Sequence, residues 1–304
     1  MANKKTSRLL LPWLLFLLAG IGGCETAANV GASLAASTGV ISYDTAQSLA
    51  KASVTMAKAF TDITPEQEYY IGRAVAATVL SRYRPHEAGR QTLYLNTLGQ
   101  TLATASARPQ TFGGYHFLIL DTDEINAFAA PGGLIFVSRG LLRCCRSEDA
   151  VAAVLAHEIG HVQQKHGLQA IQKGRLTEAL TAVAAAGAKE MGGPDLARLT
   201  TLFEESIKDV TATLINNGYS RELEREADTV AVTLLQRLGY DPHALADMLA
   251  VMEQRLPPGG PGFARTHPAP SERLASLEGA LAAAARPAAN RARQQRFQSA
   301  LGGV

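Results

Sequence analysis

Two histidines and a glutamate on one short segment have the types and spacing for hydrolysis assisted by a metal ion. His157 and His161 stand four positions apart in AVLAHEIGHVQQKHG, residues 153–167. On a helix this spacing is a rotation of roughly 40°, so both rings lie on one face and can bind one ion. Glu158 can stand beside that ion as a base without binding it. HExxH is the pattern of zinc metalloproteases.

The alternative for these residues is purely structural, with core histidines satisfied by backbone carbonyls. The surrounding stretch AVAAVLAHEIGHV, residues 150–162, is apolar almost all round, which is typical of a buried helix. Two histidines and a glutamate buried there without partners would be costly. The sequence therefore favours the metal site.

The third histidine of the stretch, His166, is expected to be a bystander. It lies five positions after His161, which is roughly 140° around a continuous helix, away from the shared face. The metzincin spacing HExxHxxGxxH would place a glycine at 164 and a histidine at 167, where this chain has Gln164 and Gly167. We interpret His166 as a residue near the helix end and not as a ligand.

A catalytic zinc usually has three protein ligands and a water, so one ligand must come from another segment. The stretch SRELEREAD, residues 220–228, offers acids at helical spacing. Glu224 lies roughly 60° from the middle of the apolar stripe of this helix. It is therefore the acid nearest the core and the predicted third ligand.

The other acids of this helix have other predicted roles. Asp228 lies one turn after Glu224 and could accept a hydrogen bond from a ligand histidine. Glu222 and Glu226 lie further from the apolar stripe. We expect both in solvent, paired with neighbouring arginines for little energy.

Six helices should position these residues, at about 65–83, 87–106, 147–166, 220–239, 242–255 and 271–284. Thr64 before Pro65 and Ser147 before two acids are typical helix starts. Gly239 is a typical helix end. The Ala-rich residues 168–215 suggest two more helices with a break between them.

Two short runs rich in aromatic and branched residues read as strands, YHFLIL at 115–120 and GGLIFVS at 132–138. The stretch DEINAFAAPGG joins them. The sequence thus predicts one α+β domain, mostly helical, with a small β-sheet preceding the HExxH helix.

The N-terminus reads as an export signal. A basic leader and the apolar residues 9–23 precede Cys24; this run is short for a membrane span and fits a signal peptide. With Gly22 and Gly23 it resembles a bacterial lipobox, which implies cleavage after residue 23 and acylation of Cys24. Glu25 resembles the signal for outer-membrane sorting. The alternatives are an ordinary signal peptide or a short membrane anchor.

Composition and charge bound the rest of the chain. Residues 24–60 read as a tether, 61–285 as the metalloprotease domain and 286–304 as a basic tail, interpreted as a frayed, solvated helix end. A net charge of +2 over 304 residues does not indicate a nucleic-acid binder. Cys144 and Cys145 are adjacent, so buried thiols are favoured over a vicinal or intermolecular disulfide.

Several stretches together resemble one family, the gluzincins that include the HtpX heat-shock protease, the CAAX prenyl endopeptidase and the periplasmic proteases BepA and LoiP. They are HEIGH, SRELEREAD, NAFAAPGGLIFVSRGLL at 126–142 and THPAPSERL at 266–274. The resemblance spans about residues 65–284 and implies a zincin-type fold. Unlike the membrane members, this chain shows no later transmembrane helices, and unlike BepA no helical repeats are expected.

The resemblance also implies roles for residues. His157, His161 and Glu224 would bind one Zn²⁺ per chain, and Glu158 would be the general base, with Asp228 behind the ligands. His267 and Arg273 match positions that contact the substrate carbonyl or the metal-bound group, and the loop histidine can occupy the open zinc position. From the residues alone, His267 could be an ordinary loop histidine and Arg273 a surface residue.

The expected function is zinc-dependent endoproteolysis of unfolded or misassembled envelope proteins, by an outer-membrane lipoprotein facing the periplasm. Substrate would add as a strand along Asn126, Ala127 and Phe128. The outer-membrane assembly machinery is a candidate partner, and nucleic acid is not. Two alternatives stay open: a zinc-stabilised assembly factor without proteolysis, and a zinc hydrolase acting on peptidoglycan.

Overall fold

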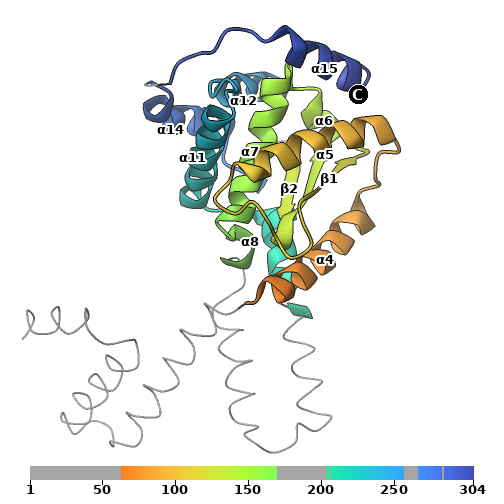
Figure 1. The fold of residues 1–304 in the computed structure, drawn as a ribbon. Coiled ribbons are helices and arrows are strands. Elements are labelled where there is room, and N and C mark those ends of the chain that lie inside the picture. Colours follow the sequence, from red (N-terminus) through yellow and green to blue (C-terminus); the bar gives the residue numbers. More distant parts are fainter. Residues whose placement is uncertain (1–62, 170–203, 206, 257–265, 283) are drawn as a thin grey trace, which may run out of the picture. The chain divides into compact units, whose positions relative to one another are not determined.

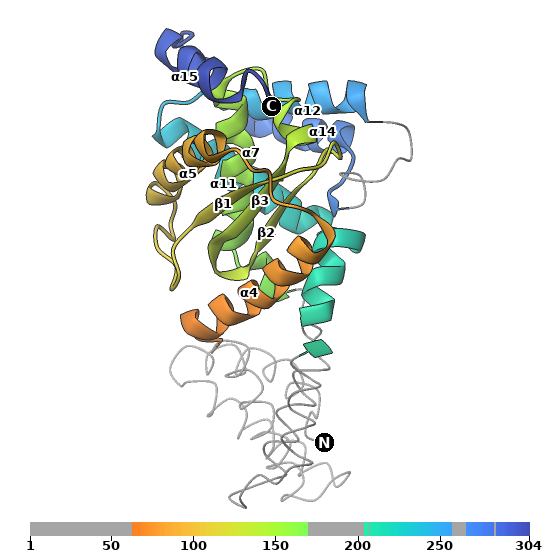
Figure 2. The same ribbon diagram turned by 90° about the vertical axis from the view of Figure 1, so that its right-hand side faces the viewer.

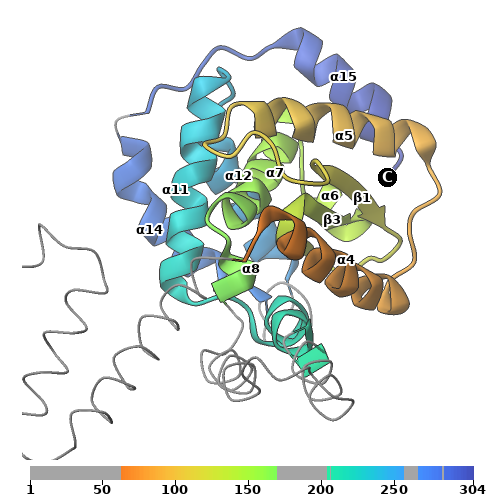
Figure 3. The ribbon, with the colours of Figure 1, turned by 60° about the horizontal axis from the view of Figure 1, so that its bottom comes forward.

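Helix α7 (Glu148–Gln163) is the central element of the computed structural model, which describes residues 63–169, 204–205, 207–256, 266–282 and 284–304. Almost every residue of α7 is buried, as its apolar composition requires. Helix α11 (Arg221–Arg237) packs along it, and α5 (Gly89–Thr104) and the sheet cover its other sides (Figures 1 and 3). The predicted HExxH helix is therefore the core of the domain.

The sheet has three strands, β1 (His116–Leu120), β2 (Ala127–Ala130) and β3 (Leu134–Ser138), in the order β1-β3-β2. Strand β3 pairs in parallel with β1 and antiparallel with β2 (Figure 2). The turn η1 (Pro131–Gly133) joins β2 to β3 and needs glycine, because Gly132 has φ 78°. The predicted mostly helical α+β fold, with a small sheet before α7, is confirmed.

The sequence places β2 in the connection between two strands, although it also assigns Asn126, Ala127 and Phe128 as the edge to which a substrate strand adds. Three of its four residues are alanine, which has little β-propensity because it fills a pleated surface poorly. All four are buried, however, and small side chains let β2 lie close to α7 and α4. Tertiary packing therefore decides this segment.

The remaining described elements surround this centre. They are α4 (Pro65–Arg82), α6 (Arg139–Leu142), α8 (His166–Gln169), the π-helical turn η2 (Thr213–Asn217), α12 (Ala244–Arg255), α14 (Pro270–Ala282) and α15 (Arg291–Leu301). The six predicted helices are confirmed with ends shifted by up to three residues. Thr64 and Ser147 cap their helices as predicted, and Gly239 follows α11 with φ 68°.

Some predictions fall on residues that the structure does not describe. The signal segment, Cys24 and the tether to residue 60 lie there, as does most of the predicted helical region 168–215. Among the described residues, no helix is both long and apolar enough to cross a bilayer.

The prediction that the two adjacent cysteines are buried thiols is confirmed. Cys144 and Cys145 are both free and buried. Burial raises the pKa of each thiol, which disfavours the reactive thiolate. Their role is therefore packing around the start of α7.

The interpretation of the C-terminal tail as a frayed, solvated end is wrong. Residues Arg291–Leu301 form α15, which lies against α7 and α5 (Figure 1). The Arg296 guanidinium donates to both oxygens of Glu148, at 3.0 and 2.5 Å. The Arg293 guanidinium stacks 3.8 Å from the centre of the Tyr240 ring. Long-range ion pairs, which a local sequence pattern cannot show, hold this helix in place.

Replacing Arg296 by alanine should lower the free energy of unfolding by about 1–2 kcal/mol, because Glu148 is buried and loses its charged donor. The loss is moderated because the Arg296 side chain is 55% exposed. Urea unfolding measures it. Arg291→Ala, at an exposed position of the same helix, should change the free energy by less than about 0.5 kcal/mol. Equal midpoints for the two variants would contradict the role of the ion pair.

Candidate metal centre

The two helices that carry the predicted ligands cross in close contact. A Cβ atom on Gly160 would lie 2.9 Å from the carbonyl oxygen and 3.0 Å from the Cα of Ala227. Glycine in HEIGH and alanine in SRELEREAD therefore let the backbones of α7 and α11 approach. This approach brings Glu224 of α11 to the histidine face of α7.

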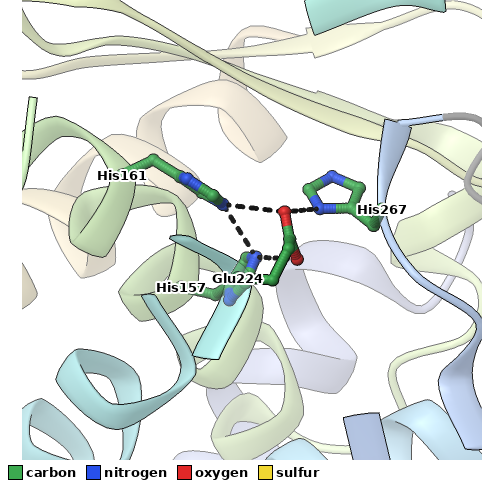
Figure 4. A group of neighbouring side chains, drawn as sticks. All are labelled: His157, His161, Glu224 and His267. Atoms are coloured by element: carbon green, nitrogen blue, oxygen red, sulfur yellow. Dashed lines mark hydrogen bonds and ion pairs between the residues drawn. The ribbon is translucent and has the colours of Figure 1, made fainter. Parts of the chain in front are cut away.

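Four side chains converge at this crossing: His157, His161, Glu224 and His267 (Figure 4). One nitrogen or oxygen of each lies within 4.8 Å of those of the others, and all four residues are buried. His157 Nε2 lies 3.1 Å from His161 Nε2. The Glu224 carboxylate oxygens lie 3.5 Å from the first nitrogen and 3.4 Å from the second. The three predicted ligands thus lie close together, and His267 lies with them.

These donors fit a tetrahedral divalent metal. Ligand atoms about 2.0–2.1 Å from a zinc ion lie about 3.3 Å from one another, close to the separations of the His157, His161 and Glu224 atoms. In addition, Glu224 Oε2 is buried and makes no hydrogen bond to the described part of the chain. A buried carboxylate oxygen without such a partner is costly, and a cation at this point would satisfy it.

Asp228 contacts the His157 ring at Nδ1, the nitrogen that does not face the other donors. The Asp228 Oδ1 atom lies 2.8 Å from His157 Nδ1, so Nδ1–H donates to the carboxylate and Nε2 faces the other ligands. Arg273 in turn donates to both Asp228 oxygens, at 2.5 and 3.1 Å. Arg273 is buried, so the alternative of a surface arginine is wrong for this position.

The pKa values of Glu224 and His161 suit metal ligands. Burial would raise the pKa of Glu224, but the histidines around it, His267 first, hold that pKa well below its ordinary value. Burial and Arg273 lower the pKa of His157, yet Asp228 and Glu224 outweigh them and raise it to about 9. Burial lowers the pKa of His161 to about 3. The ionised Glu224 and the neutral His161 are in the forms that bind a metal, whereas His157 must lose a proton when a metal binds.

Glu158 has the environment of a proton-transfer group. It is buried beside the donors, and burial raises the pKa of its carboxyl. The neighbouring His157 and His267 lower that pKa, but by less than burial raises it. A carboxylate with a raised pKa is a better base near neutral pH.

The loop before α14 reaches both the donors and the sheet edge. His267 Nδ1 lies 2.9 Å from Glu224 Oε1, and the hydroxyl of the adjacent Thr266 donates to Asn126 Oδ1 at 2.9 Å. Asn126 precedes β2, and both it and the strand residues Ala127 and Phe128 are buried. Strand β2 thus lies at the edge of the sheet, and the loop contacts the residue that precedes it.

Two predictions near the site are wrong. His166 does not point away, because α7 ends at Gln163 and Lys165 adopts φ 56°. The turn brings His166 Nδ1 to 2.9 Å from His161 Nδ1. Glu226 is half-exposed but pairs with His166 and not with an arginine, with Oε2 3.2 Å from Nε2. His166 is still no member of the donor group, as predicted.

Known metallopeptidases and proteases are similar in sequence to this chain. The Beta-barrel assembly-enhancing protease of Escherichia coli strain K12 is 33% identical over 193 residues, 60% of this chain and 37% of that protein. The Mitochondrial metalloendopeptidase OMA1 of Schizosaccharomyces pombe is 28% identical over 228 residues, 72% of this chain and 62% of that protein. The chain thus spans 37% of the length of the bacterial relative.

The family model described as Peptidase family M48 matches residues 89–281. This range is more than half of the chain and includes α7, α11 and the loop with His267. It therefore covers every residue of the donor group. By sequence and by the arrangement of its metal-binding side chains, the chain belongs to peptidase family M48.

Proposed function

We propose that the protein is a zinc-dependent endopeptidase that cleaves unfolded or misassembled proteins of the bacterial cell envelope. One observation carries the reaction type: Glu158 stands beside a buried donor group formed by His157, His161 and Glu224. A structural metal needs ligands but no base, so Glu158 favours hydrolysis over structural zinc binding.

The chemistry follows from these groups. One zinc ion per chain, held by His157, His161 and Glu224, would polarise the scissile carbonyl and lower the pKa of water in the site. Glu158 takes a proton from the attacking water, whose oxygen bonds to the carbonyl carbon. The carbon–nitrogen bond then breaks, and Glu158 returns the proton to the leaving amine. Asp228 keeps the His157 ring oriented throughout.

His267 and Arg273 are assigned to the developing oxyanion, as cationic or hydrogen-bonding groups that border the donors. Substrate would add as an antiparallel strand beside Asn126, Ala127 and Phe128. Both roles require the loop of Thr266 and His267 to move, since it now contacts Glu224 and Asn126. His267 would thus be a further ligand at rest and would leave the donor group for catalysis.

The envelope assignment rests on the sequence and the relatives. The N-terminal pattern before Cys24 supports a lipoprotein of the outer membrane that faces the periplasm. The name of the bacterial relative, Beta-barrel assembly-enhancing protease, supports a role in the assembly of β-barrel proteins. Together with the N-terminal pattern, it leads us to assign outer-membrane proteins as substrates and their assembly machinery as a partner. Binding through a backbone edge reads little side-chain sequence, which suits unfolded chains.

Incubation of the purified mature chain with casein, as an unfolded substrate, tests the function. Cleavage should stop with a zinc chelator and return when zinc is restored. Liberated amino groups and metal content are measured on the same samples. Zinc-loaded protein that cleaves neither casein nor an unfolded outer-membrane protein would contradict the peptidase assignment. Cleavage that persists without metal would contradict the mechanism.

A further inference from the structure

We propose that His166 is a positioning residue for the metal ligand His161, and that Glu226 orients His166 in turn. The three side chains form a chain from the donor group to the protein surface. His161 Nδ1 lies 2.9 Å from His166 Nδ1, and His166 Nε2 lies 3.2 Å from Glu226 Oε2. His161 and His166 are fully buried, and the Glu226 side chain is 45% exposed.

The hydrogen positions in this chain follow from the metal site. His161 Nε2 faces His157 and Glu224, so its lone pair is the one offered to a metal and Nδ1 carries the hydrogen. His166 Nδ1 must then accept, which leaves its hydrogen on Nε2. That hydrogen points to the Glu226 carboxylate. Only one direction of donation is consistent, from His161 to His166 to Glu226.

The two metal-binding histidines thus reach carboxylates in different ways. His157 donates directly to Asp228, which is buried and paired with Arg273. His161 is connected to Glu226 through the imidazole of His166. The ring of His161 also stacks on Tyr219, with ring centroids 4.4 Å apart and 20° between the ring planes. Without His166, the buried Nδ1–H of His161 would lose its hydrogen-bond acceptor. Besides the metal, only ring contacts among the described residues would then position His161, and the contact with Tyr219 is the closest of them.

The backbone before His166 supports a specific role. Lys165 adopts φ 56°, the only residue other than glycine with positive φ in the described part of the chain. This conformation costs lysine about 1 kcal/mol. The turn ends α7 early and returns His166 to His161. A continuous helix would have carried His166 away from the ring.

The test measures zinc binding and not peptide cleavage. The zinc Kd of the full mature chain is determined by competition with a coloured chelator. His166→Ala should raise the Kd about 10–100-fold, the usual effect of removing a group that supports a ligand histidine. His166→Asn, whose amide oxygen can replace Nδ1 as acceptor, should recover most of this loss. Glu226→Gln should raise the Kd less than tenfold, since its amide oxygen still accepts.

Cobalt(II) substitution gives an independent readout. Because the ring of His161 would shift, His166→Ala should change the visible absorption of the cobalt protein, whereas His166→Asn should restore it. Glu222→Gln is the matched control, because it makes the same change at another exposed position of α11. It should leave both measurements unchanged.

The outcomes separate this proposal from the proposed function. A wild-type chain that binds no zinc would overturn both. Wild-type zinc binding, with an unchanged Kd and cobalt spectrum in folded His166→Ala, would overturn the positioning role alone. If His166→Ala does not fold, the surface variant Glu226→Ala tests the proposal instead. A zinc Kd of Glu226→Ala within twofold of the wild-type value would overturn the proposal. A double variant at His166 and Glu226 that binds zinc no more weakly than His166→Ala would support the proposal, because the effects of coupled groups are not additive.

Discussion

The Glu158→Gln variant should bind zinc as the wild type does and lose about 10²–10⁴-fold in the rate of peptide cleavage. Glutamine is close in size to glutamate, so the buried position stays filled, but its amide cannot accept the water proton. The ligands His157, His161 and Glu224 are untouched. The measurement is kcat on casein or a fluorogenic peptide, with zinc content determined on the same preparation.

Two further variants serve as controls for this prediction. Glu224→Gln changes the other buried glutamate of the site and should weaken zinc binding, which separates loss of the base from loss of a ligand. The same change at the exposed Glu222 should leave both quantities unchanged. If Glu158→Gln retains full zinc and cleaves at more than one tenth of the wild-type rate, another group is the base.

The Arg273→Ala variant should lose about 3–5 kcal/mol of unfolding free energy, because it leaves Asp228 buried without its cation. Both residues of this pair are buried, and Arg273 holds the pKa of Asp228 at about 2 against the opposing effect of burial. Native stability totals only about 5–15 kcal/mol. The loss should therefore be visible as a large fall in the urea midpoint, measured with chelator present so that metal binding adds no stability.

The neighbouring residue provides the control. Glu272 pairs with Arg221 at 2.9 Å, but these side chains are 46% and 75% exposed. Glu272→Ala should therefore cost less than about 1 kcal/mol. Similar losses for the two variants would show that burial does not govern these ion pairs.

Much of the site could be predicted because it depends on local periodicity. The four-residue spacing of His157 and His161 fixes their common face on any helix. The position of Glu224 follows from its angle to the apolar stripe, since α11 must bury that stripe against α7. Asp228 lies one turn further on the same helix, and its Oδ1 atom lies 2.8 Å from His157 Nδ1.

The errors lie where local patterns carry no signal. His166 was misplaced because Lys165 has positive φ, and lysine is not a residue that marks such a turn. The docking of α15 depends on Arg296 meeting Glu148, which lies 148 positions earlier. Strand β2 depends on its neighbours and not on its alanines. Each missed feature is a tertiary contact, which spacing along the chain does not record.

The close crossing of α7 and α11 at Gly160 determines when the metal site can form. His161 and Glu224 lie 63 positions apart, so of the three ligands an unfolded chain holds only the two histidines of HEIGH close together. The third ligand arrives when α7 and α11 close on each other, which makes metal capture a consequence of folding. A newly made copy therefore has no hydrolytic centre while its own backbone is still exposed.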